Sequence, residues 1–323
     1  MPHPFATHVG LRRLVTAAIA APSVHNTQPW RFRRGDAETL ELHADPERRL
    51  PVLDPRGRSL HLSCGAALLN LRLAIRVTGH RPLVQPFPDA RDKPTLLASL
   101  RAVPAPSASL TDAELYAAIP LRHTNRQPFS TRPVPRAVRE ELAAAARAEG
   151  VVLGLPGPQT TAHLLSLVAA ADQELAADAD YLEELTRWTS MGCRGDGVPW
   201  YAFGPRPTGR GVPVRDFGLA RPVPGREVDH FAARPQLGVL MTRADGPEDW
   251  LRAGQALQRV LLTATRRGVS ASLLTQPLDV RDRSCGPWVP RTAGHIQAIL
   301  RFGYGPPVPG SPRRGVTEVL QSA

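Results

Sequence analysis

The sequence predicts an α+β fold, in which long helices pack on a mainly antiparallel β-sheet. Strand-like segments at residues 30–45, 235–242 and 295–305 are mixed with long helical patterns, without the strict alternation that a parallel sheet requires. One long apolar helix occurs twice in the chain, which indicates an internal repeat. The length of 323 residues also exceeds the usual size of one domain. We therefore expect two related halves.

The first half contains four predicted elements. Residues 11–21 carry an apolar stripe at helical spacing, and this helix should end before Pro22, because a residue that precedes proline avoids the α region. Residues 30–45 predict a β-hairpin. Residues 59–79 form a long helix with few polar positions, which indicates burial, and residues 81–87 can form a short strand.

The repeat relates residues 65–79 to residues 254–268. Both segments begin with glycine, carry Ala-Leu at their third and fourth positions and end on glycine, a helix C-cap signal. A chance match between two alanine-rich helices is the alternative. The shared context, a strand before each helix and an apolar segment after it, favours duplication. We expect an N-terminal half at 1–110 and a C-terminal half at 111–323.

The second half begins with a connector at 105–120 that leads into a short helix capped by Thr111 or Asp112. One helix should follow Pro135 and end at Gly150, and another should cover about 160–188. Glycine and proline then dominate residues 190–225, which show no periodicity. A segment of this length is either a lid over a pocket or an exposed, disordered loop.

Composition excludes several classes of protein. The net charge of +11 comes from scattered arginines with no groove-reading motif, so we expect no nucleic-acid partner. No apolar run reaches the roughly 20 residues that span a bilayer, so we expect no membrane partner. Cys64, Cys193 and Cys285 lack metal-ligand spacing, which predicts reduced thiols, no metal and a cytoplasmic protein. The run 11–21 is too weakly apolar to favour a signal peptide.

A block of neutral polar residues follows the first helix, in the sequence "APSVHNTQPW" at 21–30. Its hydroxyl and two carboxamides offer donors and acceptors without charge, and two prolines make the segment rigid. Such groups suit a flat heteroaromatic ring with alternating N–H and C=O groups. A polar turn that only caps the helix is the alternative. The residues concerned are Pro22, Ser23, Asn26 and Gln28.

Two arginine clusters are candidates for binding an anion. Arg122, Thr124 and Arg126 alternate along the chain, so an extended backbone would point them to the same side. Two guanidinium groups and a hydroxyl match the oxygens of a phosphate. Arg313 and Arg314 follow the last predicted strand and could add a second contact. Solvated tail arginines are the alternative for that pair.

The whole chain resembles the flavin-dependent nitroreductase superfamily, in its fused, double-length branch of Acg-like FMN-binding oxidoreductases. The segments that carry the resemblance are "APSVHNTQPWRF", "LSCGAALLNLRLA", "RHTNRQPF" with "RPVP", "WLRAGQALQRVLLTATRRGVS", and "GYGPP" with "SPRRGVTEVL". They cover both ends and most of the middle of the chain. The most specific element is the S-x-x-N-x-Q-P-W pattern.

The resemblance implies a nitroreductase-like fold and one FMN site to which each half contributes. Family members bind FMN between two half-length subunits, and here the matching blocks fall in opposite halves of one chain. The chain should therefore be a monomeric pseudo-dimer, with a higher oligomer left open. The implied FMN-binding residues are, on the ring, Pro22, Ser23, Asn26 and Gln28; on the phosphate, Arg122, His123, Thr124, Arg126 and Arg313, with Arg314 as the alternative; and near flavin N5, Thr275 and Gln276.

The implied activity is reduction of an electron-poor small molecule, such as a nitroaromatic or a quinone, with electrons from NAD(P)H. Hydride transfer to a flavin needs no acid–base side chain, so no catalytic residue is predicted. A second site is not expected, because the second half has only "GDGVPW" at 195–200 in place of the ring-contacting block. The alternatives are a protein that sequesters FMN beneath a closed lid and a flavin-free remnant.

Overall fold

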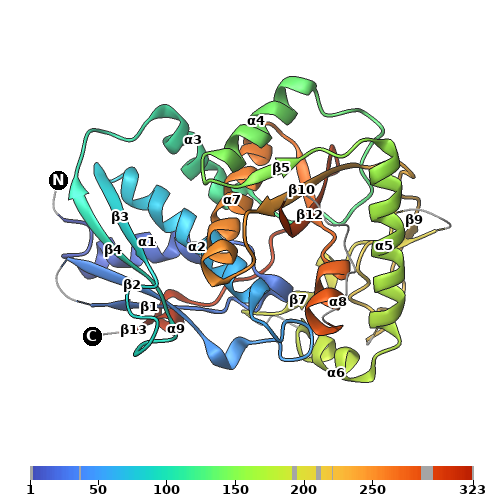
Figure 1. Cartoon of the computed structure of the whole chain (residues 1–323), viewed down its shortest axis with the longest axis horizontal. Coiled ribbons are helices and arrows are strands. Elements are labelled where there is room, and N and C mark those ends of the chain that lie inside the picture. The colour runs from blue at the N-terminus through green and yellow to red at the C-terminus, as the bar shows by residue number, and fades with distance from the viewer. Residues whose placement is uncertain are drawn as a thin grey trace.

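The computed structural model describes residues 3–35, 38–190, 195–208, 212–219, 221–284 and 294–321. Two β-sheets lie on opposite sides of a central pair of long helices, α2 (Arg58–Arg76) and α7 (Pro247–Arg266), as Figure 1 shows. Strand pairing within the two main sheets is antiparallel, except where the last strand joins the first sheet. The predicted α+β class, with helices flanking mainly antiparallel sheets, is confirmed.

The first sheet has the strand order β13-β1-β2-β4-β3. The predicted hairpin is present, and Trp30 pairs with Ala44 while Trp30 and Phe32 are fully buried, which reflects the alternation of the sequence. Helix α1 (His8–Ile19) and helix α2 pack on this sheet and share its apolar core. The strands are β1 (Trp30–Arg34), β2 (Thr39–Ala44), β3 (His80–Pro86), β4 (Leu96–Pro104) and β13 (Leu320–Gln321).

Strand β13 comes from the other end of the chain. It pairs in parallel with β1, so that Leu320 lies opposite Phe32, and it directly follows the short helix α9 (Val316–Val319). The C-terminal segment therefore crosses from the second sheet to the first. This crossing brings residues 309–315 beside the 21–30 loop.

The second sheet has the strand order β11-β12-β10-β5 and is covered on both faces. Helices α4 (Arg136–Arg147) and α7 bury one face, and α5 (Pro158–Ala176) with α8 (Gln276–Ser284) buries the other. Strand β12 (His295–Gly303), an inner strand of this sheet, is therefore buried at every position from Ile296 to Gly303. The strands are β5 (Val152–Gly154), β10 (Gln236–Thr242), β11 (Ser270–Leu273) and β12 (His295–Gly303).

The two central helices meet through the glycines that open the sequence repeat. A Cβ atom at Gly65 would collide with Leu251 O, and one at Gly254 would collide with Leu62 O. The two contacts are reciprocal, because the offset that aligns Gly65 with Gly254 also aligns Leu62 with Leu251. Reciprocal contacts of this kind are the signature of a two-fold interface. They support the interpretation of the chain as two related halves.

Two predicted helices differ in the structure. The single helix expected at 160–188 is two helices, α5 and α6 (Ala179–Arg187), because Asp178 accepts a hydrogen bond from Tyr181 N and caps a new start. Helix α3 (Leu110–Ala118) is capped by Ser109, not by Thr111 or Asp112. Short elements complete the described chain: η1 (Val24–Asn26), η2 (Pro46–Arg48), η3 (Ile119–Leu121), η4 (Trp200–Ala202), β6 (Thr189–Ser190), β7 (Val198–Pro199), β8 (Arg206–Pro207) and β9 (Val228–Asp229).

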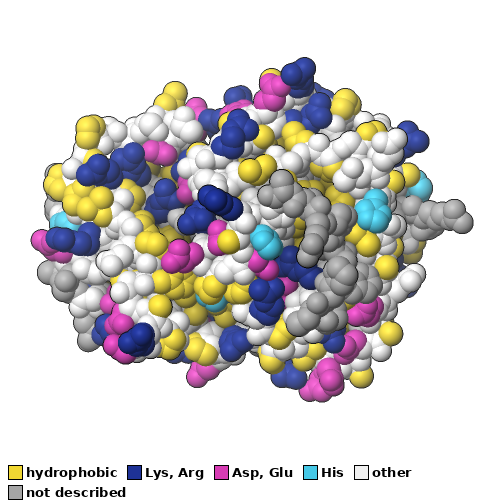
Figure 2. All heavy atoms as spheres, viewed as in Figure 1, with side chains coloured by type: hydrophobic (Ala, Val, Ile, Leu, Met, Phe, Trp, Pro, Cys, Tyr) yellow, Lys and Arg dark blue, Asp and Glu magenta, His cyan; other side chains and the backbone are white. Residues whose placement is uncertain are grey.

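Among the described residues, no helix is long and apolar enough to cross a membrane, and no three His, Cys, Asp or Glu side chains form a group that could hold a metal ion. Cys64 is a buried free thiol on α2, whereas Cys193 and Cys285 lie outside the described residues. Figure 2 shows basic side chains dispersed over the visible face and interleaved with acidic ones, as the scattered arginines of the sequence suggest.

Candidate functional site

The 21–30 loop has an unusual backbone. His25, Asn26 and Gln28 all have positive φ, and among the described residues only Phe87 shares this property without being glycine. Each such residue costs of order 1–3 kcal/mol, and strain of this kind is found preferentially at ligand sites. Side chains hold the loop in place: Ser23 Oγ accepts from Gln28 N at 2.9 Å, and Ser63 Oγ on α2 accepts from Val24 N at 3.1 Å.

The two carboxamides of this loop are engaged within the protein. Asn26 donates to Gly197 O at 2.9 Å and accepts from Arg313 at 3.0 Å. Gln28 is fully buried, donates to Gly195 O at 2.8 Å and accepts from Arg314 N at 2.9 Å. Asn26 lines the cavity described below, whereas Gln28 lies behind its wall. The structure thus assigns Gln28 a role in joining three segments of the chain.

The R-x-T-x-R segment is extended, as predicted. Thr124 forms a parallel β-bridge with Ala271 of β11, and Asn125 N donates to Ala271 O at 2.9 Å. The side chains of Arg122, Thr124 and Arg126 therefore alternate to one side and meet the 21–30 loop. Together with Arg313 they line one cavity of about 40 Å³, here called the arginine cavity. Its lining residues are Pro22, Ser23, Asn26, Arg122, His123, Thr124, Arg126, Val198, Pro309, Ser311 and Arg313.

The arginine cavity contains cations without counterions. Among the described residues no carboxylate forms an ion pair with Arg122, Arg126 or Arg313, although many of the other described arginines have one. Arg122 is 4 % exposed and its Nε has no hydrogen-bond partner. Arg126 donates to Ala202 O at 2.9 Å, and Arg313 donates to Ala21 O at 3.1 Å. This cationic lining is suited to binding an anion.

The pKa values of these groups also reflect the lack of carboxylate partners among the described residues. Burial and the neighbouring charge of Arg313 lower the pKa of Arg122 to about 9. Burial, with the charge of Arg215, lowers the pKa of Arg126 to about 10, and burial alone lowers that of Arg313 to about 10. The pKa of His123 is also lowered, by burial and by the charges of Arg122 and Arg313. A bound dianion would reverse these shifts.

A second cavity adjoins the first and shares Pro22 and Ser23 with it. It has a volume of about 70 Å³, lies between α2, α7 and the second sheet, and is mostly apolar; we call it the helix cavity. Thr275 reaches this cavity, whereas Gln276 is fully buried, lies outside its lining and donates to Asp172 at 3.4 Å. The lining residues are Pro22, Ser23, Val24, Arg58, Ser59, Leu62, Ser63, Ala66, Leu257, Leu273, Thr275 and Ala298.

The structure separates the two C-terminal arginines. Arg313 lines the arginine cavity, but Arg314 points away from it and pairs with Asp45 at 3.8 Å and with Glu318 at 3.7 Å. Arg314 also donates to Gln28 O at 3.4 Å. Its charge is balanced by these carboxylates, so Arg313 is the better candidate for an anion contact.

The described part of the 190–225 segment packs against both cavities. Val198 lines the arginine cavity, and Phe203 and Phe217 are buried in the adjacent apolar core. Phe217 lies against the His25 ring at 5.3 Å and beneath the Arg126 guanidinium at 4.6 Å. Part of this segment is therefore buried beside the arginine cavity, whereas Trp200, Tyr201 and residues 206–208 are exposed, and its role as a lid stays a prediction.

A buried ionic network beneath Thr275 was not predicted from the sequence. Thr275 Oγ1 donates to Asp279 Oδ2 at 3.1 Å, and Asp279 pairs with Arg215 of the 195–219 segment and with Arg58 of α2. Desolvation raises the pKa of Asp279, and the two arginines oppose that shift. The partners come from distant parts of the chain and form no local motif, so no sequence signal could have identified them.

His25 also lies near the site and was not predicted from the sequence. It is 6 % exposed, and neither ring nitrogen has a hydrogen-bond partner. Its pKa lies well below the ordinary value because of burial and because of the charges of Arg215 and Arg126. His25 is therefore neutral near pH 7, and it packs as an apolar ring between the 21–30 loop and the 195–219 segment.

Two relatives that match almost the whole chain carry related names. No family model matches the chain. A Mycobacterium tuberculosis protein named "Putative NAD(P)H nitroreductase Rv3131" is 37 % identical, with 96 % of this chain and 91 % of the relative covered. A second, "Putative NAD(P)H nitroreductase acg" from the same organism, is 31 % identical over 99 % of this chain and 98 % of its own length. A solved nitroreductase with bound FMN from Bacteroides fragilis matches 59 % of this chain and 88 % of its own, with a TM-score of 0.34 and 12 % identity.

Proposed function

Because the chain belongs to the nitroreductase superfamily, in the branch that contains the mycobacterial Acg protein, we propose that it is an FMN-dependent oxidoreductase that uses NAD(P)H. The observation that carries the proposal is the arginine cavity. The buried Arg122 and the partly buried Arg126 and Arg313, none of which forms an ion pair with a described residue, surround a space that a few water molecules or one phosphate group would fill. Forked donors around a dianion form strong, charge-assisted hydrogen bonds.

The residues fit the phosphate end of FMN, and they suggest a division of roles between the halves. Arg122 and Arg126 would hold the phosphate from the C-terminal half, with Arg313 completing the cradle. Pro22 and Ser23 line both cavities and so connect the phosphate end to the helix cavity, where the ring would lie. This division supports a pseudo-dimer of residues 1–110 and 111–323 that acts as a monomer.

FMN would supply the redox chemistry, by passing electrons from a nicotinamide to an electron-poor acceptor such as a nitroaromatic or a quinone. The chain's own residues would bind and orient. Asp279 accepts a hydrogen bond from the Thr275 hydroxyl, so this side chain is held by the network, and the backbone N–H groups of Thr275 and Gln276 would meet the flavin. Val198 would exclude water from the phosphate end of the site, with Phe203 and Phe217 packed in the apolar core beside it.

A second candidate function follows from the size of the helix cavity. At about 70 Å³ it holds only part of a tricyclic ring, so the walls must move when FMN enters. The 195–219 segment adjoins both cavities, since Val198 lines one and Arg215 contacts Thr275 of the other at 3.4 Å. If this segment closes again over the ring, the protein would sequester FMN without turnover.

The binding proposal is tested by comparing FMN with riboflavin, which lacks the phosphate. The double variant Arg122→Ala/Arg126→Ala should weaken FMN binding by about 100-fold or more, since each charged hydrogen-bonding group contributes roughly 1.5–3 kcal/mol. Riboflavin binding should be unchanged. The matched control is Arg12→Ala/Arg13→Ala, which removes two exposed arginines of α1. An equal loss for both ligands, or no loss, would refute the phosphate assignment.

Turnover separates the two candidate functions. Steady-state NADH and NADPH oxidation with a nitroaromatic or quinone acceptor is measured on the FMN-loaded protein and on Phe217→Ala. Measurable turnover by the unaltered protein supports the oxidoreductase. Turnover that is absent and appears in Phe217→Ala supports sequestration, because Phe217 anchors the segment between His25 and Arg126.

A further inference from the structure

A larger cavity lies outside the proposed flavin site, on the other side of the R-x-T-x-R segment. It has a volume of about 590 Å³ and opens between residues 129–133 and residues 230–236, with the end of strand β12 as its floor. Arg122, Thr124 and Arg126 line the arginine cavity, whereas Phe129, three residues further along the chain, lines this one. We call it the outer cavity.

Its floor carries a buried cation that has no counterion. Arg301 is 2 % exposed and forms no ion pair with any described residue. It donates through Nε to Ser272 Oγ at 3.0 Å and through Nη2 to Asn125 O at 3.3 Å and Gln127 O at 2.9 Å. These bonds leave Nη1 without a hydrogen-bond partner among the described residues. Burial lowers the pKa of Arg301 to about 10, because the charged guanidinium loses solvation inside the protein.

Two phenyl rings lie close to the Arg301 guanidinium. Its central carbon lies 3.9 Å from the Phe129 ring centre and 5.3 Å from that of Phe231. Rings at these distances stabilise the cation by cation–π interaction. A carboxylate or phosphate that approaches Nη1 would meet a preorganised donor, because hydrogen bonds and packing already fix the group.

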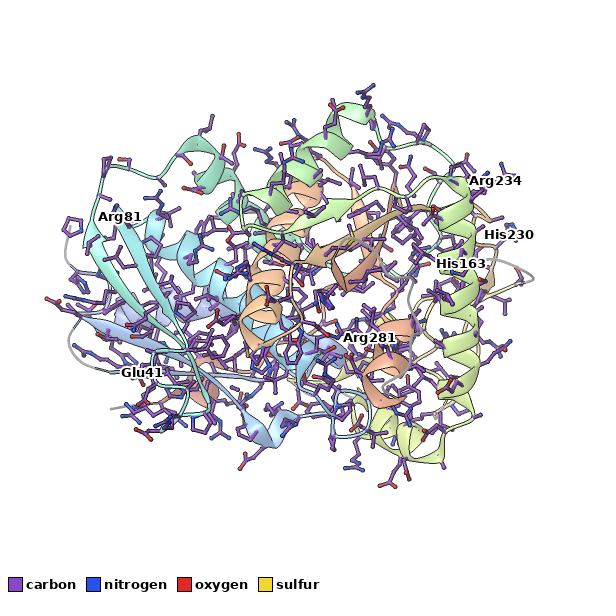
Figure 3. The ribbon with its side chains drawn as sticks, in the orientation of Figure 1. Glu41, Arg81, His163, His230, Arg234 and Arg281 are labelled. Carbon is purple, nitrogen blue, oxygen red and sulfur yellow. The ribbon has the colours of Figure 1, made fainter. Side chains whose placement is uncertain are left out.

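The rim of the outer cavity also carries arginines that form no ion pair with a described residue. Arg132, stacked on Tyr304 at 4.5 Å, and Arg234 both line it, and neither forms an ion pair with a described residue. No carboxylate is among the described residues that line the cavity. Figure 3 shows Arg234 and His230 close together beside helix α5, while Arg81 lies at the opposite end of the molecule. The described lining therefore carries positive charge and no negative charge, which favours the binding of an anion.

We propose that the outer cavity is a second binding site, for a small organic anion that joins a carboxylate or phosphate to a flat apolar body. The acid group pairs with the edge of Arg301 and is covered by Arg132 and Arg234. The apolar body lies against Phe129, Phe302 and Val212, which supply the non-polar part of the wall. The site is independent of FMN, since it shares no lining residue with the arginine cavity or the helix cavity.

Four probe molecules test the proposal by isothermal titration calorimetry on the full chain, with FMN added in excess to fill the flavin site. Benzoate should bind, whereas benzamide, which has the same shape without the charge, should bind at least about tenfold more weakly. Phenyl phosphate against inorganic phosphate shows whether the apolar body contributes. Equal affinity for benzoate and benzamide, or no benzoate binding, would overturn the proposal.

Variants locate the site. Arg132→Ala/Arg234→Ala removes two exposed arginines and should weaken benzoate binding by about tenfold, while Arg81→Ala should leave it unchanged. Arg301→Gln should abolish it, but this change also loosens Asn125 and Gln127, so the exposed pair is the decisive variant. The variant Arg122→Ala/Arg126→Ala should bind benzoate normally. If it alone loses benzoate, the anion binds in the arginine cavity and the proposal is wrong, whatever the outcome for FMN.

Discussion

The close approach of helices α2 and α7 makes a quantitative prediction about Gly65. A Cβ atom at this position would overlap Leu251 O and lie 2.9 Å from the Gly254 Cα atom, so Gly65→Ala forces two backbones apart. The reciprocal change, Gly254→Ala, brings a Cβ atom within 2.8 Å of the Leu62 Cα atom. Neither neighbour is the flexible end of a side chain, and the helices themselves must therefore shift.

The expected magnitude combines two opposing effects. Overpacking in a well-packed core costs typically about 1–3 kcal/mol, and a contact between backbones falls in the upper part of that range. Replacing glycine with alanine inside a helix returns about 1 kcal/mol through helix propensity. The free energy of unfolding should therefore fall by about 2 kcal/mol in either single variant. The double variant should lose less than the sum, because one separation of the helices accommodates both methyl groups.

Urea unfolding followed by circular dichroism measures the three variants. Gly157→Ala is a control without crowding, since a Cβ atom there meets nothing within 4 Å; because Gly157 is the N-cap of α5, the change should cost at most about 1 kcal/mol. The reasoning fails if Gly65→Ala is as stable as the unaltered protein, or if Gly65→Ala and Gly254→Ala differ greatly. The second result would also argue against two equivalent halves.

Three further predictions concern single side chains. Arg313→Ala should weaken FMN binding by about tenfold or more, because Arg313 lines the arginine cavity. Arg314→Ala should mainly lower the midpoint of unfolding, because Arg314 pairs with Asp45 outside that cavity. Fluorescence titration measures FMN binding by both variants, and the reverse pattern would refute the assignment. Burial raises the pKa of Asp54 to about 7, so the folded state holds a proton that the unfolded state has released between about pH 4 and 7. Stability from this group should decline as pH rises through that window, by at most about 1.4 kcal/mol per unit, and Asp54→Asn should flatten the pH dependence measured by urea unfolding. Cys64 is fully buried and burial raises the pKa of its thiol, so iodoacetamide should leave it unmodified in the native protein, as peptide mass spectrometry can show.

The elements that the sequence predicted well are those whose signal is local. The hairpin at 30–45 and the long helices carry their periodicity in consecutive residues, and the same holds for the alternation of Arg122, Thr124 and Arg126. Strand β4 was not predicted, because its proline-flanked residues give no clear alternation, although it lies between β2 and β3 in the sheet. The break at Asp178 was also missed, since the capping aspartate lies inside an otherwise continuous helical pattern.

Positions that depend on long-range packing could not be predicted from the chain alone. Gln28 was expected near a ligand, but its amide joins Gly195 to Arg314, two residues that lie far along the chain. The FMN-binding residues as a set remain a prediction, supported by the cavity around Arg122. The network of Asp279 with Arg215 and Arg58 unites three segments that share no motif, and only the folded structure reveals it.

The return of the last strand to the first sheet has a consequence for how the protein matures. Until residues 316–321 leave the ribosome, the outer edge of β1 has no partner, and an unpaired strand edge invites association with other chains. The same stretch of chain delivers Arg313 to its cavity only moments earlier. Completion of the sheet and readiness to receive an anion are thus reached together, once residues 313–321 have been synthesised, and a nascent chain stalled before that point would have neither.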